Sequence, residues 1–180
     1  MEITSTSTQH HEDSHSHAFQ LLSLLLQYPE GLELDEIREV TNQLANVQVK
    51  QLVNQFVDYL TSNSEDNLTS YYVNTFDFNS TTALYLTYSN LGEERERGQI
   101  LVQLKELYDA VGLQLVSDEL PDYLPLVLEF YAVAPREVSR QLIEDFRLVM
   151  EKLREELSKI DSPYAWLVEA AQIQIKQYIQ

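Results

Sequence analysis

The chain has 180 residues, which fits one domain with a substantial hydrophobic core, because domains commonly contain roughly 100 to 200 residues. Its 29 acidic and 12 basic side chains give a formal net charge of −17, which opposes binding to nucleic acid and anionic lipid and favours a cationic partner such as a basic peptide. Without cysteine, the chain cannot form disulfides, thiolate-held iron–sulfur clusters or thiolate zinc sites.

Residues 1–17 are mainly Ser, Thr, His and acids, a composition that cannot offset the entropy lost on ordering. We expect a disordered tail over 1–17 and a folded domain over 18–180. All four histidines lie in this tail, so weak transition-metal binding is the alternative to a simple solvated tail. The apolar run at 21–26 is far shorter than the roughly 18 residues that span a bilayer, so we expect a cytoplasmic protein without stable membrane insertion.

The first half of the domain is predicted to form helices separated by residues that stop them. Residues 18–27 should form a helix that ends just before a proline, since the residue preceding proline is disfavoured in the helical conformation. Residues 35–60 should form one long helix or two shorter ones, with a break near Asn46. Ser64 can begin a helix that runs to about Phe76, because its hydroxyl accepts from free amides and acids follow it.

The second half is predicted to be helical as well. A helix over 81–89 precedes one over 94–111, whose apolar side chains form one stripe and which ends at Gly112, a residue that tolerates the left-handed conformation. The longest helix should cover 136–160, where apolar residues recur every three or four positions, and a last helix should begin near Pro163. With only four glycines and no hairpin turns, the sequence predicts an all-α, single-domain helical bundle.

The domain offers few groups for catalysis. Because residues 18–180 contain neither histidine nor cysteine, they exclude a Ser-His-Asp triad, a thiolate nucleophile and histidine-bound zinc, haem or iron. Adjacent acids such as Glu155 and Glu156 point apart on a helix, which indicates a solvated surface rather than a catalytic carboxylate pair. We expect no enzymatic activity, no catalytic residues and no bound metal or cofactor. A carboxylate-based enzyme or metal-binding bundle is the alternative.

Residues 119–130 combine two prolines and three acids with an apolar helical run. If Asp122 caps the helix, Pro125 falls at the third helical position, where its missing amide breaks no hydrogen bond. A helical wheel then separates an inward face from an outward one. The inward face contains Tyr123, Leu126, Val127 and Phe130. The outward face contains Asp122, Pro125 and Glu129.

Two interpretations of this segment remain. In the first, Asp122 is only a helix cap, and Pro121 and Pro125 stiffen the connection. In the second, Pro125 removes an amide that a capping carboxylate would use, which leaves an oxygen available for a ligand. A concave wall with Glu119, Asp122 and Glu129 beside aromatic side chains fits a peptide that carries basic and apolar residues.

The sequence Glu-Leu-Pro-Asp-Tyr-Leu-Pro at 119–125 resembles the Glu-Leu-Pro-Asp-His-Leu-Pro signature of the NarJ-type chaperones, the nitrate reductase delta subunit family. Blocks at 72–77, 82–88 and 97–113 resemble the same family in the same order. Together they cover roughly residues 19 to 150. Tyr123 departs from the signature, since histidine often stands there in the wider superfamily. Tyrosine can pack and donate a hydrogen bond, but it supplies no titrating imidazole.

The resemblance implies a fold of the TorD-like type and a non-enzymatic role. Such a chaperone would bind the N-terminal segment of the respiratory nitrate reductase catalytic subunit and assist molybdenum cofactor insertion before membrane attachment. A structural subunit retained in the mature reductase is the alternative. We expect peptide-binding residues at Tyr72, Phe76, Asp77, Tyr88, Glu119, Pro121, Asp122, Tyr123, Pro125 and Glu129. For the aromatic side chains at 72, 76, 85 and 88, a purely structural place in the core is the alternative.

Overall fold

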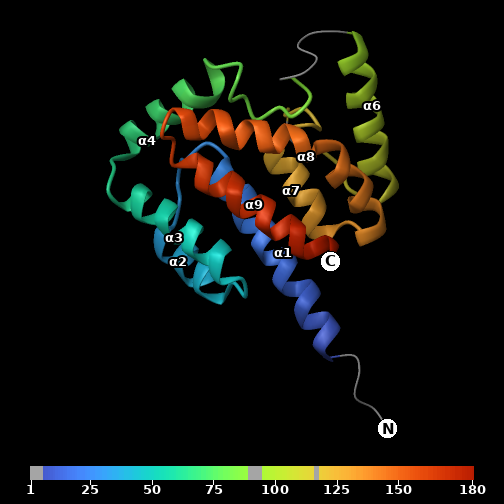
Figure 1. Cartoon of the computed structure of the whole chain (residues 1–180), viewed down its shortest axis with the longest axis horizontal. Coiled ribbons are helices and arrows are strands. Elements are labelled where there is room, and N and C mark those ends of the chain that lie inside the picture. The colour runs from blue at the N-terminus through green and yellow to red at the C-terminus, as the bar shows by residue number, and fades with distance from the viewer. Residues whose placement is uncertain (1–5, 89–94, 116–117) are drawn as a thin grey trace.

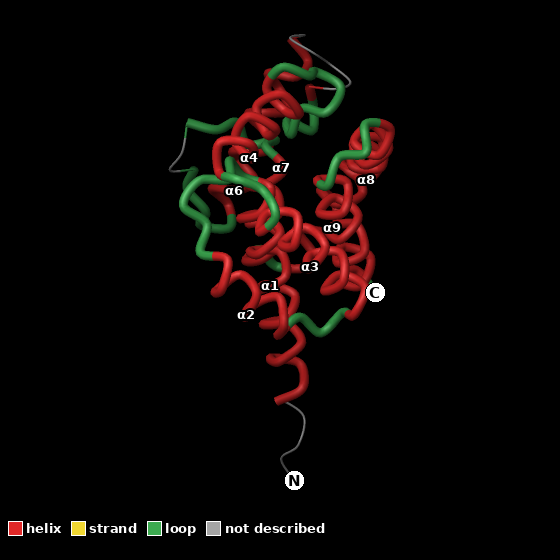
Figure 2. Tube along the Cα trace, turned by 90° about the vertical axis from the view of Figure 1, so that its left-hand side faces the viewer, coloured by secondary structure: helices red, strands yellow, loops and turns green. Residues whose placement is uncertain are grey.

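A computed structural model describes residues 6–88, 95–115 and 118–180 of the chain, and side chains from His15 onward. Over these ranges the regular secondary structure is helical, apart from one isolated antiparallel bridge between Tyr85 and Tyr123. Figure 2 shows the helices and the loops that join them. The predicted all-α fold class is therefore confirmed. None of the described helices is long and apolar enough to cross a membrane.

The helices lie close to their predicted positions, except at the start of α1 and over residues 81–87. In chain order they are α1 (Thr6–Leu26), α2 (Leu34–Gln43), α3 (Val47–Thr61), α4 (Glu65–Tyr72), the π-helical turn η1 (Val73–Asp77), α6 (Arg95–Ala110), α7 (Leu124–Val133), α8 (Arg136–Lys159) and α9 (Tyr164–Ile179).

The predicted helix boundaries follow from local hydrogen bonds. Asn46 separates α2 from α3, and its side-chain oxygen accepts from the amides of Gln48 and Val49 at 2.8 and 3.0 Å. Ser64 begins α4 by accepting from the amide of Asn67. Gly112 follows α6 with a φ of 82°, the left-handed conformation predicted for this position. These caps confirm the corresponding sequence predictions.

Helix α1 lies at the centre of the bundle. It packs along α7 and also against α9, while α9 packs against α3 and α8 (Figure 1). The inward side of α1 is largely apolar, with Phe19, Leu22, Leu25 and Leu26 buried. Helices α7 and α9 cover the buried side of α1, and a surface groove lies where the exposed side of α1 meets α7.

Helix α1 begins at Thr6, which corrects the predicted disordered tail over residues 6–17. The side chain of His15 contacts α9. Its Nδ1 atom lies 2.6 Å from the side-chain nitrogen Nε2 of Gln174, and its ring packs edge-on against Tyr178. The buried turns of α1 already form the helix nucleus, so extending the helix costs little free energy per residue. The composition of residues 6–17 alone does not reveal this effect. Residues 1–5 lie outside the described part of the chain.

The prediction of a helix over residues 81–89 is wrong for residues 81–87, which form turns around the isolated bridge. The amide of Leu86 donates to the carbonyl of Asp122 at 2.9 Å, and the amide of Leu124 donates to the carbonyl of Leu84 at 2.8 Å. These backbone groups pair across two distant segments, so they are not available for intrahelical hydrogen bonds.

The carboxylate of Asp122 joins three segments in the interior. It is 0% exposed, and its Oδ2 atom accepts from the amide and hydroxyl of Thr87 at 3.1 and 2.5 Å. The guanidinium of Arg97 on α6 approaches the same oxygen at 3.3 Å and donates to the Thr87 hydroxyl at 3.0 Å. Asp122 therefore ties residues 84–88 and α6 to the start of α7.

This burial corrects the predicted orientation of the 119–130 segment. Asp122 does not cap α7, because the cap position is Tyr123 and Pro125 is the second helical residue rather than the third. The predicted outward face does not exist as such, since Asp122 and Pro125 are buried and only Glu129 of that set is exposed. Pro121 is buried as well, and its carbonyl accepts from Tyr108 Oη at 2.8 Å.

We expect the Asp122→Ala variant to lower the free energy of unfolding by about 3 to 5 kcal/mol, because it leaves the buried Arg97 without a counter-charge. Asp58→Ala is the control, since it removes an ion pair with Arg38 that is exposed and worth about 1 kcal/mol or less. Urea unfolding of both variants measures the difference. Equal losses in the two variants would contradict a structural role for Asp122.

Candidate functional site

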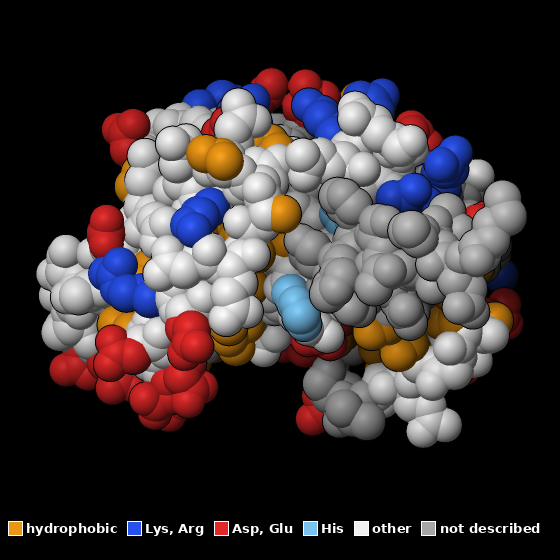
Figure 3. Space-filling model, turned by 90° about the horizontal axis from the view of Figure 1, so that it is seen from below, with side chains coloured by type: hydrophobic (Ala, Val, Ile, Leu, Met, Phe, Trp, Pro, Cys, Tyr) orange, Lys and Arg blue, Asp and Glu red, His pale blue; other side chains and the backbone are white. Residues whose placement is uncertain are grey.

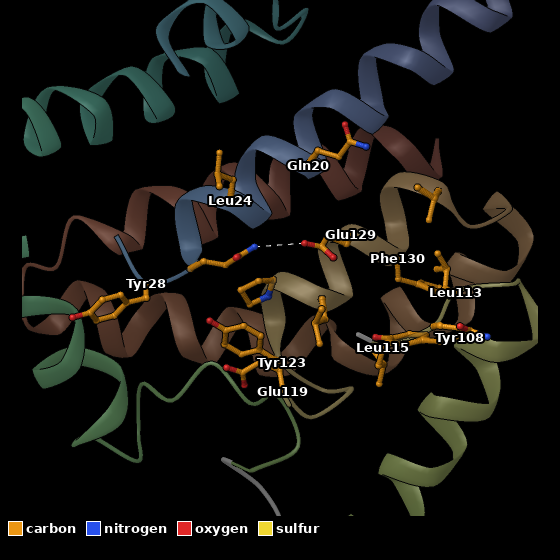
Figure 4. Close-up of a pocket in the computed structure, with 15 residues that line it drawn as sticks. Gln20, Leu24, Tyr28, Tyr108, Leu113, Leu115, Glu119, Tyr123, Glu129 and Phe130 are labelled. Carbon is orange, nitrogen blue, oxygen red and sulfur yellow. Dashed lines mark hydrogen bonds between the residues drawn. The ribbon is translucent and has the colours of Figure 1, made fainter. Parts of the chain in front are cut away.

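A surface groove of about 670 Å³ lies between α1 and α7, and we refer to it as the α1–α7 groove. Residues 113–115, which follow α6, and the segment before α7 complete its walls (Figure 4). The lining residues are Gln20, Leu24, Gln27, Tyr28, Tyr108, Leu113, Gln114, Leu115, Glu119, Tyr123, Pro125, Leu126, Glu129, Phe130 and Val133.

The groove has an apolar, aromatic floor. Pro125 and Leu126 contribute the first turn of α7, and the ring of Phe130 stacks on Tyr108 with centroids 4.8 Å apart. Tyr28 extends the aromatic surface at the α1 end, where its ring is nearly half exposed and lies edge-on to Tyr72. Such a floor suits the apolar side chains of a bound segment.

Glu129 supplies one carboxylate of the groove and is held in place by α1. Ser23 Oγ donates to Glu129 Oε1 at 3.1 Å, and Gln27 Nε2 approaches the same oxygen at 3.5 Å (Figure 4). Because these donors both engage Oε1, they orient the carboxylate of a side chain that is otherwise exposed.

Glu119 supplies the second carboxylate, at the end of the groove near Tyr123. Its Oε2 atom accepts from Tyr85 Oη at 2.5 Å. The hydroxyls of Tyr123 and Tyr72 lie 3.0 Å apart, and Tyr72 also donates to the carbonyl of Leu26 at 3.1 Å. Hydrogen bonds of this kind hold the tyrosines and Glu119 in fixed positions around one end of the groove.

Burial and negative charge keep these tyrosines protonated. Burial raises the pKa of Tyr123 to about 12; the hydrogen bond with Tyr72 opposes this shift, and the charges of Glu119 and Asp77 reinforce it. Burial, and then the hydrogen bond to Glu119, also raises the pKa of Tyr85. A neutral Tyr123 at physiological pH can pack against a ligand and take part in hydrogen bonds, but it cannot serve as a base.

The charge of the groove is purely acidic. Its lining includes Glu119 and Glu129 but no lysine or arginine. Partial burial and the charge of Glu119 raise the pKa of Asp77, which places a third acid within electrostatic range of this end. Among the described residues, no group of histidine, cysteine or acidic side chains has the arrangement of a metal site. The groove therefore favours a ligand that is apolar and positively charged.

The structure brings four of the ten predicted site residues to the groove: Glu119, Tyr123, Pro125 and Glu129. Pro121 and Asp122 lie beneath it, buried. Asp77 lies outside the lining and influences it only through its charge. Tyr88 lies elsewhere, with its ring under the guanidinium of Arg97.

Tyr72 and Phe76 belong to the aromatic core, the alternative considered for them. Both rings pack edge-on against the buried Tyr164 of α9, with centroid distances of 5.8 and 4.8 Å. Tyr72 still reaches the site indirectly, through its hydroxyl contact with Tyr123. It is a supporting residue rather than a lining residue.

Sequence reasoning missed the wall that α1 contributes. Gln20 and Leu24 of α1 line the groove, as do Gln27 and Tyr28 directly after the helix. Leu24 is 43% exposed on a helix whose other leucines are buried. Such a position follows from the sequence only once the neighbours of α1 are known.

Comparisons with known proteins identify the family. Residues 42–168 match the nitrate reductase delta subunit family. The chain belongs to that family. It is 40% identical over 153 residues to the probable nitrate reductase molybdenum cofactor assembly chaperone NarJ of Bacillus subtilis, a match that covers 83% of each chain. It is 32% identical over 154 residues to the corresponding NarJ chaperone of Escherichia coli, which covers 82% of this chain and 64% of that protein.

A solved structure supports the fold. The chain superposes on a putative redox enzyme maturation protein from Archaeoglobus fulgidus with a TM-score of 0.65 and 21% identity, over 89% of this chain and 93% of the other. At that identity the likeness concerns the fold alone. It agrees with the helical chaperone fold that the delta subunit resemblance implied.

The buried tyrosines predict that stability falls at high pH. A raised pKa means that the native state keeps the phenolic proton after the unfolded chain, with a usual pKa near 10, has lost it. Below about pH 10 these tyrosines therefore contribute fully to the free energy of unfolding. That free energy declines as the pH rises toward 12, by at most about 1.4 kcal/mol per pH unit for each such tyrosine. Urea unfolding between about pH 8 and pH 11 measures this slope.

Replacing Tyr123 by Phe removes one of these groups, so the decline should become shallower in the variant. A free energy of unfolding that is independent of pH over this range in the wild-type chain would contradict the described burial of the tyrosines.

Proposed function

We propose that this protein is a non-enzymatic chaperone of a respiratory nitrate reductase. It binds the N-terminal segment of the catalytic subunit in the α1–α7 groove and assists insertion of the molybdenum cofactor in the cytoplasm, before the reductase attaches to the membrane. Membership of the delta subunit family supports the role in assembly, and the relatives in Bacillus subtilis and Escherichia coli carry names that state it.

The observation that carries the proposed binding mode is a pair of oriented carboxylates on an apolar floor. Glu129 is fixed by Ser23 and Glu119 by Tyr85, so neither carboxylate needs to be ordered when a cationic side chain arrives. Preorganisation of this kind reduces the entropy cost of binding. The floor between them, formed by Pro125, Leu126 and Phe130, receives apolar side chains of the segment.

The same geometry favours binding over catalysis. The polar groups of the groove are carboxylates, amides and tyrosine hydroxyls, and Tyr123 stays neutral at physiological pH. General acid–base chemistry requires a group whose pKa lies near the working pH, which Tyr123 does not have. A surface that binds and shields a segment needs only shape, apolar area and charge, all of which the groove supplies.

We expect Glu129→Gln and Glu119→Gln each to weaken binding of a synthetic peptide from the N-terminus of the catalytic subunit by about two- to fivefold, since exposed charge pairs contribute roughly 0.5 to 1 kcal/mol. The loss should shrink as salt rises. Glu106→Gln is the matched control, because Glu106 is exposed on α6 outside the groove. Wild-type affinity in both groove variants would remove these acids from the binding site.

The chaperone role has its own test. Cells without this chain should accumulate nitrate reductase that lacks molybdenum, and complementation should restore the metal content. Purified active reductase should contain little of this chain, since a chaperone leaves after assembly. An equal stoichiometry of this chain in the active enzyme would indicate a retained structural subunit instead.

A further inference from the structure

A second groove, of about 420 Å³, lies between α1 and α2, and we refer to it as the α1–α2 groove. Its floor is apolar, and it is bordered by the loop that connects the two helices. The lining residues are His17, Gln20, Leu21, Leu24, Gly31, Leu32, Glu33, Glu36, Ile37 and Val40.

The two grooves meet on the outer side of α1. Gln20 and Leu24 line both of them, so these side chains form the ridge between the grooves. In Figure 4, Leu24 projects from α1 on the side away from Tyr123. Leu24 is 43% exposed, which leaves an apolar surface continuous from one groove to the other.

The α1–α2 groove, like the α1–α7 groove, is lined by apolar and acidic side chains. Val40 leaves apolar area at the surface, and Glu33 and Glu36 are exposed at the border, while no lysine or arginine lines the groove. In Figure 3 acidic side chains gather at the left-hand end, the end where α2 and α3 lie in Figure 1. A ligand suited to both grooves carries apolar and basic side chains along its whole length.

We propose that the segment bound in the α1–α7 groove crosses Leu24 and continues into the α1–α2 groove. There it places an apolar side chain against Leu21, Ile37 and Val40 and a basic side chain beside Glu33 and Glu36. This inference rests on the proposed function and extends it, because it assigns a second subsite to the same bound segment. A second copy of the chain fits poorly here, since its net charge of −17 would face these acids.

Two peptides of different length test the inference. The shorter peptide is an N-terminal piece of the catalytic subunit that is long enough for the α1–α7 groove alone, and the longer one adds about ten residues, which span roughly 15 Å as a helix. We expect the longer peptide to bind more tightly to the wild-type chain. Val40→Asp should lower the affinity for the longer peptide by about tenfold, because burying a charge beside the ligand opposes binding. The affinity for the shorter peptide should be unchanged.

Val102→Asp is the matched control for this variant. Val102 is 58% exposed on α6 and lines neither groove, whereas Val40 is 36% exposed on α2. Both substitutions introduce the same charge at a surface valine of a helix. The control should bind the longer peptide with wild-type affinity.

A second comparison isolates the charges. Replacing Glu33 and Glu36 together by Gln should weaken binding of the longer peptide by about two- to fivefold at low salt. The control replaces Asp35 by Asn and Glu39 by Gln, which removes two exposed acids from the same helix outside the groove. The control should have a clearly smaller effect.

The outcomes separate this inference from the proposed function. If the shorter peptide binds but Val40→Asp binds the longer one as tightly as the wild type does, the second subsite is wrong and the proposed function stands. If Val40→Asp instead abolishes a dimer seen by light scattering, the occupant is a second copy and the inference is overturned. If neither peptide binds the wild-type chain, the proposed function fails, and the second subsite fails with it.

Discussion

The carboxylate of Asp122 is fully buried and shares its Oδ2 atom between Thr87 and Arg97. A buried charge is stable only when it is paired and hydrogen-bonded, so these contacts constrain the three segments that supply them. The 84–88 segment must lie against residues 122–124, and α6 must approach the start of α7. This arrangement places Tyr123 and Pro125 at the groove and leaves Glu119 and Glu129 on either side of them. The groove therefore depends on an interaction that lies beneath it.

The prolines and acids of residues 119–130 thus have two roles, one in the structure and one in ligand binding. Asp122 and Pro121 belong to the interior, and Tyr108 reaches the carbonyl of Pro121 from α6. Glu119 and Glu129 lie at the surface, each fixed by a hydroxyl donor from another segment. A substitution of Asp122 would disturb binding through the fold, whereas a substitution of Glu129 would act on the ligand directly. Acids within one motif can therefore give similar binding defects for different physical reasons.

Local patterns predicted most of the helices because their signals are local. Apolar spacing located α3, α6 and α8, and Asn46 and Ser64 marked helix starts through hydrogen bonds that span two or three residues. The groove was only partly predictable, because the α1 wall becomes a site only when α7 packs beside it. The helical wheel misplaced Asp122, since a wheel describes residues inside a helix and Asp122 precedes the helix in a backbone bridge. Residues 81–87 were misassigned for the same reason: their partners lie about 35 positions away along the chain.

Photocrosslinking tests the central claim, that the α1–α7 groove holds the N-terminal segment of the catalytic subunit. A benzophenone side chain introduced in place of Val133, which lines the groove and is 55% exposed, should capture that segment in cells that express both proteins. The same side chain in place of Val102, which is 58% exposed and lies outside the groove, should not capture it. Mass spectrometry of the crosslinked product identifies the captured peptide. Capture from position 102 but not from position 133, or capture of a different part of the reductase from position 133, would contradict the proposed site.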